Sequence, residues 1–393
     1  MRAAGSLASG DLTAAAAAPP SRLPPWYLWC VAVAVTSANV GGQWDIAWHR
    51  SIGRDGFWTA PHVAIYLCGV LAGIACGALI LGTTFAGGAG RATSVRVLGF
   101  RGPLGAFIAS WGGFTMLASA PFDNWWHGAY GLDVKILSPP HVVLMLGALA
   151  VQIGALILIL SELNRAEGEA RRWREGLFLY VGAMILASQH TATMEYSSRV
   201  SMHTALFYRA AALAFVAVLV GIARAARVRW GATIPAAIYT AYYLALLWIL
   251  PLVHAEPKLG PVLHPVTTLI PAGFPLLLLA PAVAIDLALR RLDRLSPWPL
   301  AVALGVLFLG TLLLVQWPFA DFLNSAAAHN AFFGSGYLDY RTGPDSFLSR
   351  NLYVHWEATP AAFWRGLAVA LAAAIAMARL GLGWGDWMRR LRR

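Results

Sequence analysis

Residues 139–162 read PPHVVLMLGALAVQIGALILILSE, and no charged side chain occurs between His141 and Glu162. A helix needs roughly 20 apolar residues to cross the hydrocarbon core of a bilayer. This stretch is therefore predicted to be a transmembrane helix. The composition agrees, since 59% of the 393 residues are hydrophobic and only 12% are charged. That charged share is about half of what soluble domains carry.

Apolar blocks of similar length recur along the chain and predict an all-α fold, a polytopic membrane helical bundle of about ten transmembrane helices. Pro271, Pro275 and Pro281 predict a kink in the eighth of these spans. The predicted spans are 26–48, 60–84, 102–122, 139–162, 175–194, 203–223, 231–253, 264–289, 298–317 and 359–380.

These spans divide the chain into three parts. Residues 1–25 are rich in Ala, Pro and Ser and are predicted to be a disordered cytoplasmic tail. Residues 26–165 form a four-helix membrane unit, and residues 166–393 add six further transmembrane helices. A long outer loop is expected at about 318–358.

Basic residues are unevenly shared between the two sets of loops. One set, with the chain ends, holds most of them, including Arg91, Arg165, Arg172, Arg227, Arg291 and Arg390. The other set holds far fewer, such as Arg50, Arg54, Lys135, Arg199 and Lys258. The positive-inside rule then predicts a bacterial-type inner membrane protein with both termini in the cytoplasm. It also accounts for the net charge of +11, so no nucleic-acid partner is expected.

With this orientation every histidine falls on the outer side or at the outer end of a helix. A preference of inner loops for Arg, which leaves His elsewhere, is the alternative explanation. The ten are His49, His62, His127, His141, His190, His203, His254, His264, His329 and His355.

Two of the outer turns carry the same pattern. Residues 44–67 read WDIAWHRSIGRDGFWTAPHVAIYL, and residues 122–146 read FDNWWHGAYGLDVKILSPPHVVLML. They align with one gap. In the first copy Asp45 and His49 are four apart, so both project from one face of a helix. His62 opens the next helix, and the turn can bring it back towards them.

The second copy repeats this arrangement with Asp123, His127 and His141. Two imidazoles and a carboxylate suit Cu, Zn, Fe or Ni, and three protein ligands leave a position for water, O2 or substrate. An ionisable group near the hydrocarbon costs about 2.5–3.5 kcal/mol, which favours metal binding over packing. Interfacial caps and an aromatic belt are the alternative, since Pro61 and Pro140 suit helix starts.

Two further features are left open. Asp55 and Asp133 are either groups that hold a ligand imidazole in one tautomer or solvated turn carboxylates. His190 and His203 are thirteen residues apart, like His49 and His62, with Glu195 between them. No Asp lies four residues before His190, so the pattern is incomplete. The alternatives are a third metal site and an i,i+4 ion pair between Glu195 and Arg199.

The two patterns resemble the C subunit of the copper membrane monooxygenases, the particulate methane and ammonia monooxygenase family, over about residues 44–160. The resemblance implies copper at both sets of ligands, and O2-dependent hydroxylation of a small apolar substrate or ammonia. Asp123, His127 and His141 are then expected to be the catalytic set. The expected partners are other monooxygenase subunits or further copies of the chain, besides the lipid bilayer.

This sequence departs from the family in two ways. The family subunit often has Asn where Asp123 stands, which puts the charge of that site in doubt. It also has no counterpart for residues beyond about 165, and the family's soluble copper-binding domain, which belongs to another subunit, is not present here.

Two other functions compete with the oxygenase. A non-catalytic membrane protein that binds or transports copper or zinc is one, although the Ala-, Leu-, Val- and Gly-rich centres of the spans count against transport. A protein that binds haem b through two histidines is the other, and the paired Asp residues argue against it.

Overall fold

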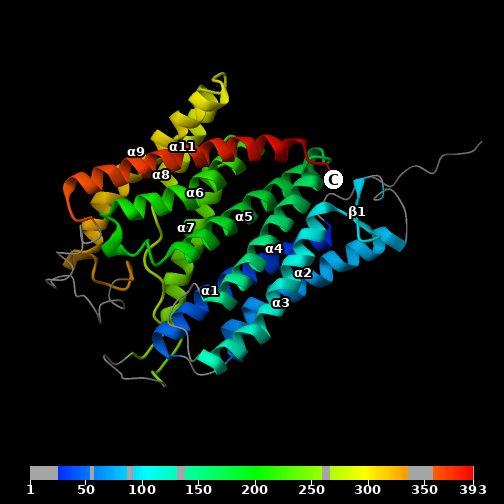
Figure 1. Cartoon of the computed structure of the whole chain (residues 1–393), viewed down its shortest axis with the longest axis horizontal. Helices are drawn as coiled ribbons and strands as arrows, with labels where there is room; N and C mark the ends of the chain where they lie inside the picture. The colour runs from blue at the N-terminus through cyan, green and yellow to red at the C-terminus, as the bar shows by residue number, and fades with distance from the viewer. Residues whose placement is uncertain are drawn as a thin grey trace, which may run out of the picture.

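The computed structural model describes residues 25–53, 57–85, 91, 93–130, 138–258, 266–334 and 357–392. It confirms the predicted all-α membrane bundle: ten α-helices occur in this part of the chain, and the sole sheet found there is a two-stranded hairpin. The predicted tail lies outside the described residues except for Pro25. Figure 1 shows α1 to α5 running along one diagonal, with α11 crossing above them.

Six of these helices are long and apolar enough to cross a membrane: α2, α4, α6, α7, α9 and α11. Helices α1, α3 and α5 are as long and pack beside them, whereas α8 is short. The bounds are α1 Trp26–Ser51, α2 Ala60–Phe85, α3 Leu104–Tyr130, α4 Pro139–Leu163, α5 Gly168–Thr193, α6 Ala205–Ala225, α7 Thr233–Ile249, α8 Leu279–Arg291, α9 Pro297–Leu323 and α11 Pro360–Arg390, with 3-10 turns η2 Arg199–Ser201, η3 Leu250–Leu252 and η4 Ala326–Ala328.

Glycine contacts bring the first four helices close together. An added Cβ on Gly112 of α3 would lie 2.6 Å from the backbone N of Val151 in α4. One on Gly69 of α2 would lie 2.9 Å from the carbonyl O of Gly113 in α3. Small residues at such positions let membrane helices pack backbone to backbone. The α1–α2 and α3–α4 pairs are thereby held as neighbours in one unit.

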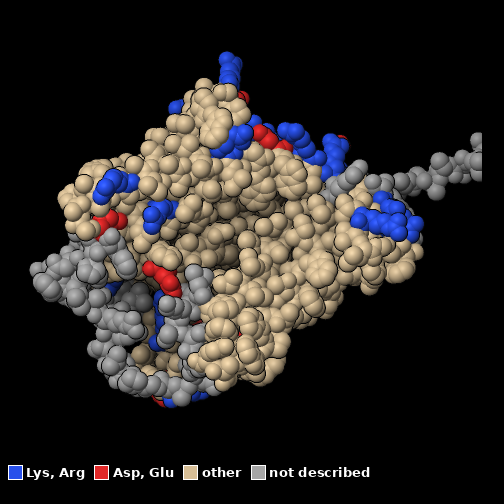
Figure 2. Space-filling model, in the orientation of Figure 1, with Lys and Arg blue, Asp and Glu red and all other residues tan. Residues whose placement is uncertain are grey.

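The predicted cytoplasmic loops gather at one end of the bundle. The hairpin β1 (Val95–Val97) and β2 (Phe100–Gly102) joins α2 to α3 there. In the α4–α5 turn, Asn164 Nδ2 donates to the carbonyl O of Leu391 after α11, at 2.8 Å. Figure 2 shows Arg and Lys side chains clustered near this hairpin and the end of α11. The grouping agrees with the predicted topology, in which these loops share one side.

The eighth predicted span, 264–289, is wrong as a continuous helix. Helix α8 begins only at Leu279, and the described residues from 266 to 278 are not helical. Pro271 and Pro275 lack the backbone N–H that a helix interior needs, and their rings clash with the preceding turn. The prolines therefore prevent a helix where we expected only a kink.

Neighbouring helices satisfy the backbone of this non-helical segment. Ile270 N donates to Ser51 Oγ at 2.7 Å, and Leu277 N donates to Gln316 Oε1 at 3.0 Å. Irregular backbone at membrane depth is tolerated where protein groups replace its missing hydrogen bonds. The segment is thus a buried strap that joins α1, α7 and α9.

The long outer loop begins later than predicted. Helix α9 continues through Pro318 to Leu323, so the residues from 318 to 323 are helical rather than loop. The apolar and aromatic side chains of this last stretch pack in the protein, as shown by the rings of Phe319 and Phe322 stacked 6.0 Å apart. The section from 335 to 356 lies outside the described residues.

Candidate metal centres

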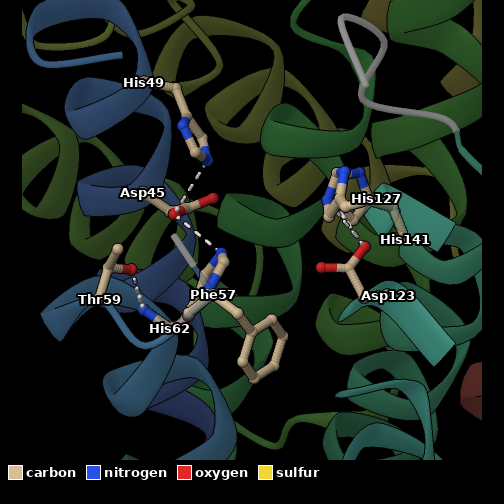
Figure 3. A network of polar contacts seen from close by, with 8 residues as sticks. All are labelled: Asp45, His49, Phe57, Thr59, His62, Asp123, His127 and His141. Atoms are coloured by element: carbon tan, nitrogen blue, oxygen red, sulfur yellow. Dashed lines mark hydrogen bonds and ion pairs between the residues drawn. The ribbon is translucent and has the colours of Figure 1, made fainter. Parts of the chain in front are cut away.

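The structure brings each predicted ligand set together at a helix–turn–helix corner (Figure 3). Each corner takes its Asp and first His from the end of one helix and its second His from the start of the next. The first corner consists of Asp45 and His49 on α1 and His62 on α2; the second consists of Asp123 and His127 on α3 and His141 on α4. Within each corner the three ligand atoms lie within 4.8 Å of one another.

In the first corner two imidazole nitrogens face one carboxylate oxygen. His49 Nε2 lies 3.4 Å from Asp45 Oδ1, and His62 Nε2 lies 3.2 Å from the same atom. The two imidazole rings are 6.2 Å apart between centroids and inclined at 63°. Both rings therefore point their Nε2 edges at a shared centre while their bodies stay apart.

The second corner has the same geometry. His127 Nε2 lies 3.4 Å and His141 Nε2 3.5 Å from Asp123 Oδ1. The rings are 6.4 Å apart and inclined at 64°. The agreement between the corners shows that the repeated sequence spacing folds into a repeated three-dimensional arrangement.

These separations fit a metal ion. Zinc-type bonds of about 2.0–2.2 Å to nitrogen and oxygen, at tetrahedral angles, put neighbouring ligand atoms about 3.3–3.5 Å apart. Hydrogen bonds from nitrogen to oxygen are usually shorter, about 2.7–3.2 Å. Asp45 Oδ1 and Asp123 Oδ1 are buried, and neither accepts a hydrogen bond of good geometry. A buried anionic oxygen that faces two imidazoles without such a bond matches what a cation would satisfy.

The ring of His62 is oriented by its second nitrogen. His62 Nδ1 lies 2.5 Å from the carbonyl O of Phe57, to which the Nδ1–H tautomer donates. That tautomer leaves the Nε2 lone pair directed at the shared centre, as in ligand histidines generally. The backbone N of His62 also donates to Thr59 Oγ1 at 3.4 Å, which fixes the start of α2 (Figure 3).

Two predicted accessory groups, Asp55 and Asp133, lie outside the described residues, as do His264 and His355.

The third histidine pair does not form a site. His190 and His203 occupy separate surroundings, and the described part of the chain holds no third group of His, Cys, Asp or Glu suited to a metal. Tyr239 OH lies 2.7 Å from His190 Nδ1, and the ring of Tyr243 packs 4.5 Å from the same imidazole. His190 therefore links α5 to α7, and Glu195 is not part of a ligand set.

His203 is engaged by α9 instead. Its Nε2 lies 3.0 Å from Asp321 Oδ1, and its ring meets the ring of Trp317 edge-on at 4.6 Å. Burial between these groups lowers the pKa of His203 despite the neighbouring carboxylate. Sequence spacing contains no signal for either partnership, because the partners are far apart in the chain.

Comparison of the chain with known protein families, with curated proteins and with solved structures finds no match.

Proposed function

We propose that this protein binds two transition-metal ions, copper in the first place, and is the metal-bearing part of an O2-dependent membrane hydroxylase. The proposed substrate is a small apolar molecule or ammonia, and the proposed location is the outer face of a bacterial-type inner membrane. The observation that supports this most is the pair of matching corners, each with two imidazole nitrogens 3.2–3.5 Å from one buried carboxylate oxygen.

The carboxylate and the two imidazoles of each corner have different roles. The carboxylate offsets the charge of the ion, and the two neutral imidazoles complete a three-ligand set with an open position. Bound copper supplies one-electron redox chemistry and a place for O2 to bind. The helices around the second corner limit the access of water to its carboxylate, since Asp123 is only 4% exposed.

The second corner, Asp123 with His127 and His141, is proposed as the catalytic one. Its carboxylate offsets one positive charge of an oxidised ion, which the neutral Asn often found in the family it resembles would not do. Partner subunits of that family, or further copies of this chain, would then supply what the chain lacks.

Zinc suits the same ligands, so a non-catalytic copper or zinc protein is the second candidate. The ligand residues of the corners do not distinguish this second candidate from the hydroxylase. What separates the two functions is whether the bound metal changes oxidation state and consumes O2.

Metal content and reactivity test both functions. The protein, purified in detergent and exposed to equal copper and zinc, should retain two copper ions per chain by mass spectrometry of the metal. Replacement of both His127 and His141 with Ala should remove one of them. The matched control is His254→Ala, which changes an exposed outer histidine outside both corners.

The optical spectrum and O2 uptake complete the test. Reductant-driven O2 uptake that rises with an added apolar substrate supports the hydroxylase, whereas zinc retention without uptake supports the second candidate. A Soret band with no copper would mean haem and would overturn both.

A further inference from the structure

We infer that the cavity on the membrane side of the two corners is the substrate site and that it accepts hydrocarbons of roughly six to ten carbons rather than only the smallest gases. This inference rests on the proposed function. It depends on where the cavity lies, how large it is, what lines it and how it is reached.

The cavity is lined by residues that lie close in the chain to ligands of both corners, although no ligand residue itself lines it. It is lined by Gly42 of α1, Ile65 of α2 and Val142 of α4. Gly42 and Ile65 are each three residues from a first-corner ligand, which is about 4.5 Å along a helix axis. Val142 directly follows His141. A molecule held there lies beneath both proposed metal ions.

The volume suits a molecule larger than methane or ammonia. The cavity measures about 300 Å³. An apolar cavity of about 150 Å³ is enough to hold benzene, so twice that volume suits a hydrocarbon of up to roughly ten carbons. It is also at the lower limit of sites for small organic ligands, about 300–1,000 Å³.

The wall is mainly apolar, with methionine and aliphatic side chains such as Met116, Met145 and Leu149. Three of its polar residues bond one another, and Gln152 Oε1 is the one buried polar atom of these residues that has no hydrogen-bond partner in the described part of the chain. Gln152 Nε2 donates to Ser188 Oγ at 2.6 Å, and Ser188 Oγ donates to Asn39 Oδ1 at 2.9 Å. A wall of this kind favours an apolar occupant over a chain of water molecules, because water needs two to four polar partners.

Access is from the side of the bundle. Two lining residues of α4, Val142 and Leu146, are 38% and 59% exposed. They lie on a helix apolar enough to cross the membrane, so this exposed face meets lipid. Hydrocarbons concentrate in the bilayer core. They can therefore reach the cavity sideways past α4 without crossing the aqueous outer face.

Uptake of a probe tests the cavity without any metal. Metal-free protein in lipid nanodiscs is equilibrated with hexafluorobenzene, and depletion of the headspace is measured against empty nanodiscs of the same lipid. We expect saturable uptake beyond lipid partition. Ala148→Phe, which fills the cavity from α4, should remove it, as should Gly42→Leu, whose side chain enters open space. Ala118→Phe, at an exposed position of α3 outside the cavity, should not.

Fluorine relaxation then tests the position of the cavity. Cu²⁺-loaded protein should speed the relaxation of bound hexafluorobenzene relative to Zn²⁺-loaded protein, and Ala148→Phe should abolish this difference while the metal content stays unchanged. Equal relaxation with both metals would place the cavity away from the corners and overturn the inference.

The remaining outcomes are distinct. No saturable uptake overturns the inference even if two copper ions are bound. A lipid acyl chain retained by the unaltered protein, detected by native mass spectrometry and lost in Ala148→Phe, also overturns it. If the protein takes up hexafluorobenzene saturably but proves unable to bind copper or zinc, the proposed function is refuted and only a hydrocarbon site remains.

Discussion

The two corners hold their ligands in the same geometry, yet their surroundings differ. The first corner is hydrogen-bonded to the second part of the chain. Lys258 N donates to the carbonyl O of Ile52 at 2.9 Å, and Arg50 Nη1 donates to the carbonyl O of Pro271 at 3.3 Å. The second corner ends α3 with rings directed outward, as Trp125 is 57% and Tyr130 68% exposed.

The carboxylates show the opposite order of burial. The side chain of Asp123 is 5% exposed and that of Asp45 is 17% exposed. Exposed rings do not distinguish the corners, because Trp58 beside the first corner is 85% exposed. The corners therefore differ in the burial of the carboxylate and in the hydrogen bonds that tie the first corner to residues 258 and 271.

The largest expected effect comes from the carboxylates. Asp123→Ala should abolish metal binding at the second corner and leave the first unchanged, and Asp45→Ala should do the reverse. Mutating a group that hydrogen-bonds a metal ligand lowers metal affinity about 10- to 100-fold. Loss of a direct ligand should lower the affinity by more than that. Chelator competition with metal analysis measures both sites. Loss of both ions from either variant would show that the corners are not independent.

Acid should release metal from both corners. Imidazole binds metal only when neutral, and its ordinary pKa is about 6.5. Because each corner has two imidazoles, affinity should fall by up to about 100-fold per pH unit once protons compete for both rings. Copper retention between pH 8 and pH 5 measures this. Retention that stays constant down to pH 5 would argue against imidazole ligands.

Tight packing of α3 on α4 should matter for the second corner alone. Gly112→Ala adds a Cβ that would lie 2.6 Å from Val151 N, so a cost of about 1–3 kcal/mol in the free energy of unfolding is expected. The second corner should also lose affinity. Gly73→Ala in α2, where an added Cβ meets nothing within 4 Å, is the matched control. An equal loss at both corners, measured by thermal unfolding and metal titration, would contradict this.

The smallest expected effect concerns the strap behind the first corner. Ser51→Ala removes the hydroxyl that accepts from Ile270 N and leaves a buried N–H unpaired, which costs about 1–3 kcal/mol. Metal affinity should fall modestly at the first corner and stay constant at the second. Ser325→Ala, which removes a hydroxyl bonded to the carbonyl O of Phe322 away from both corners, serves as the control. A change confined to the second corner would argue against the strap as an anchor.

Local features were predictable from the sequence. Apolar block lengths located the helices, and the four-residue spacing of Asp and His fixed which side chains share a helix face. The corners followed because each turn is short and returns the chain to its neighbour. Contacts between distant segments were not predictable. Nothing in the sequence around Pro271 indicates that Ser51 and Gln316 accept hydrogen bonds from the backbone N–H groups of Ile270 and Leu277.

The same limit explains the third histidine pair and the cavity. His190 and His203 share the spacing of a true corner, but Tyr239 and Asp321 engage them from other helices. The cavity arises from small and flexible residues on α1 to α5 that fail to fill one space together. Such a cavity is a property of the assembled helices, and the sequence pattern of no single helix indicates it.

The Gly69–Gly113 contact between α2 and α3 has a consequence for the pair of corners. The backbones of the two helices are in contact there, since an added Cβ on Gly113 would lie only 2.8 Å from the Gly69 carbonyl O. No side chain of these two residues therefore separates α2 from α3, and this close contact sets the distance between the two ligand sets. Bulkier residues at this seam would lengthen that distance before disturbing either ligand set. The seam is therefore a place where the backbone alone determines how far apart the two ligand sets lie.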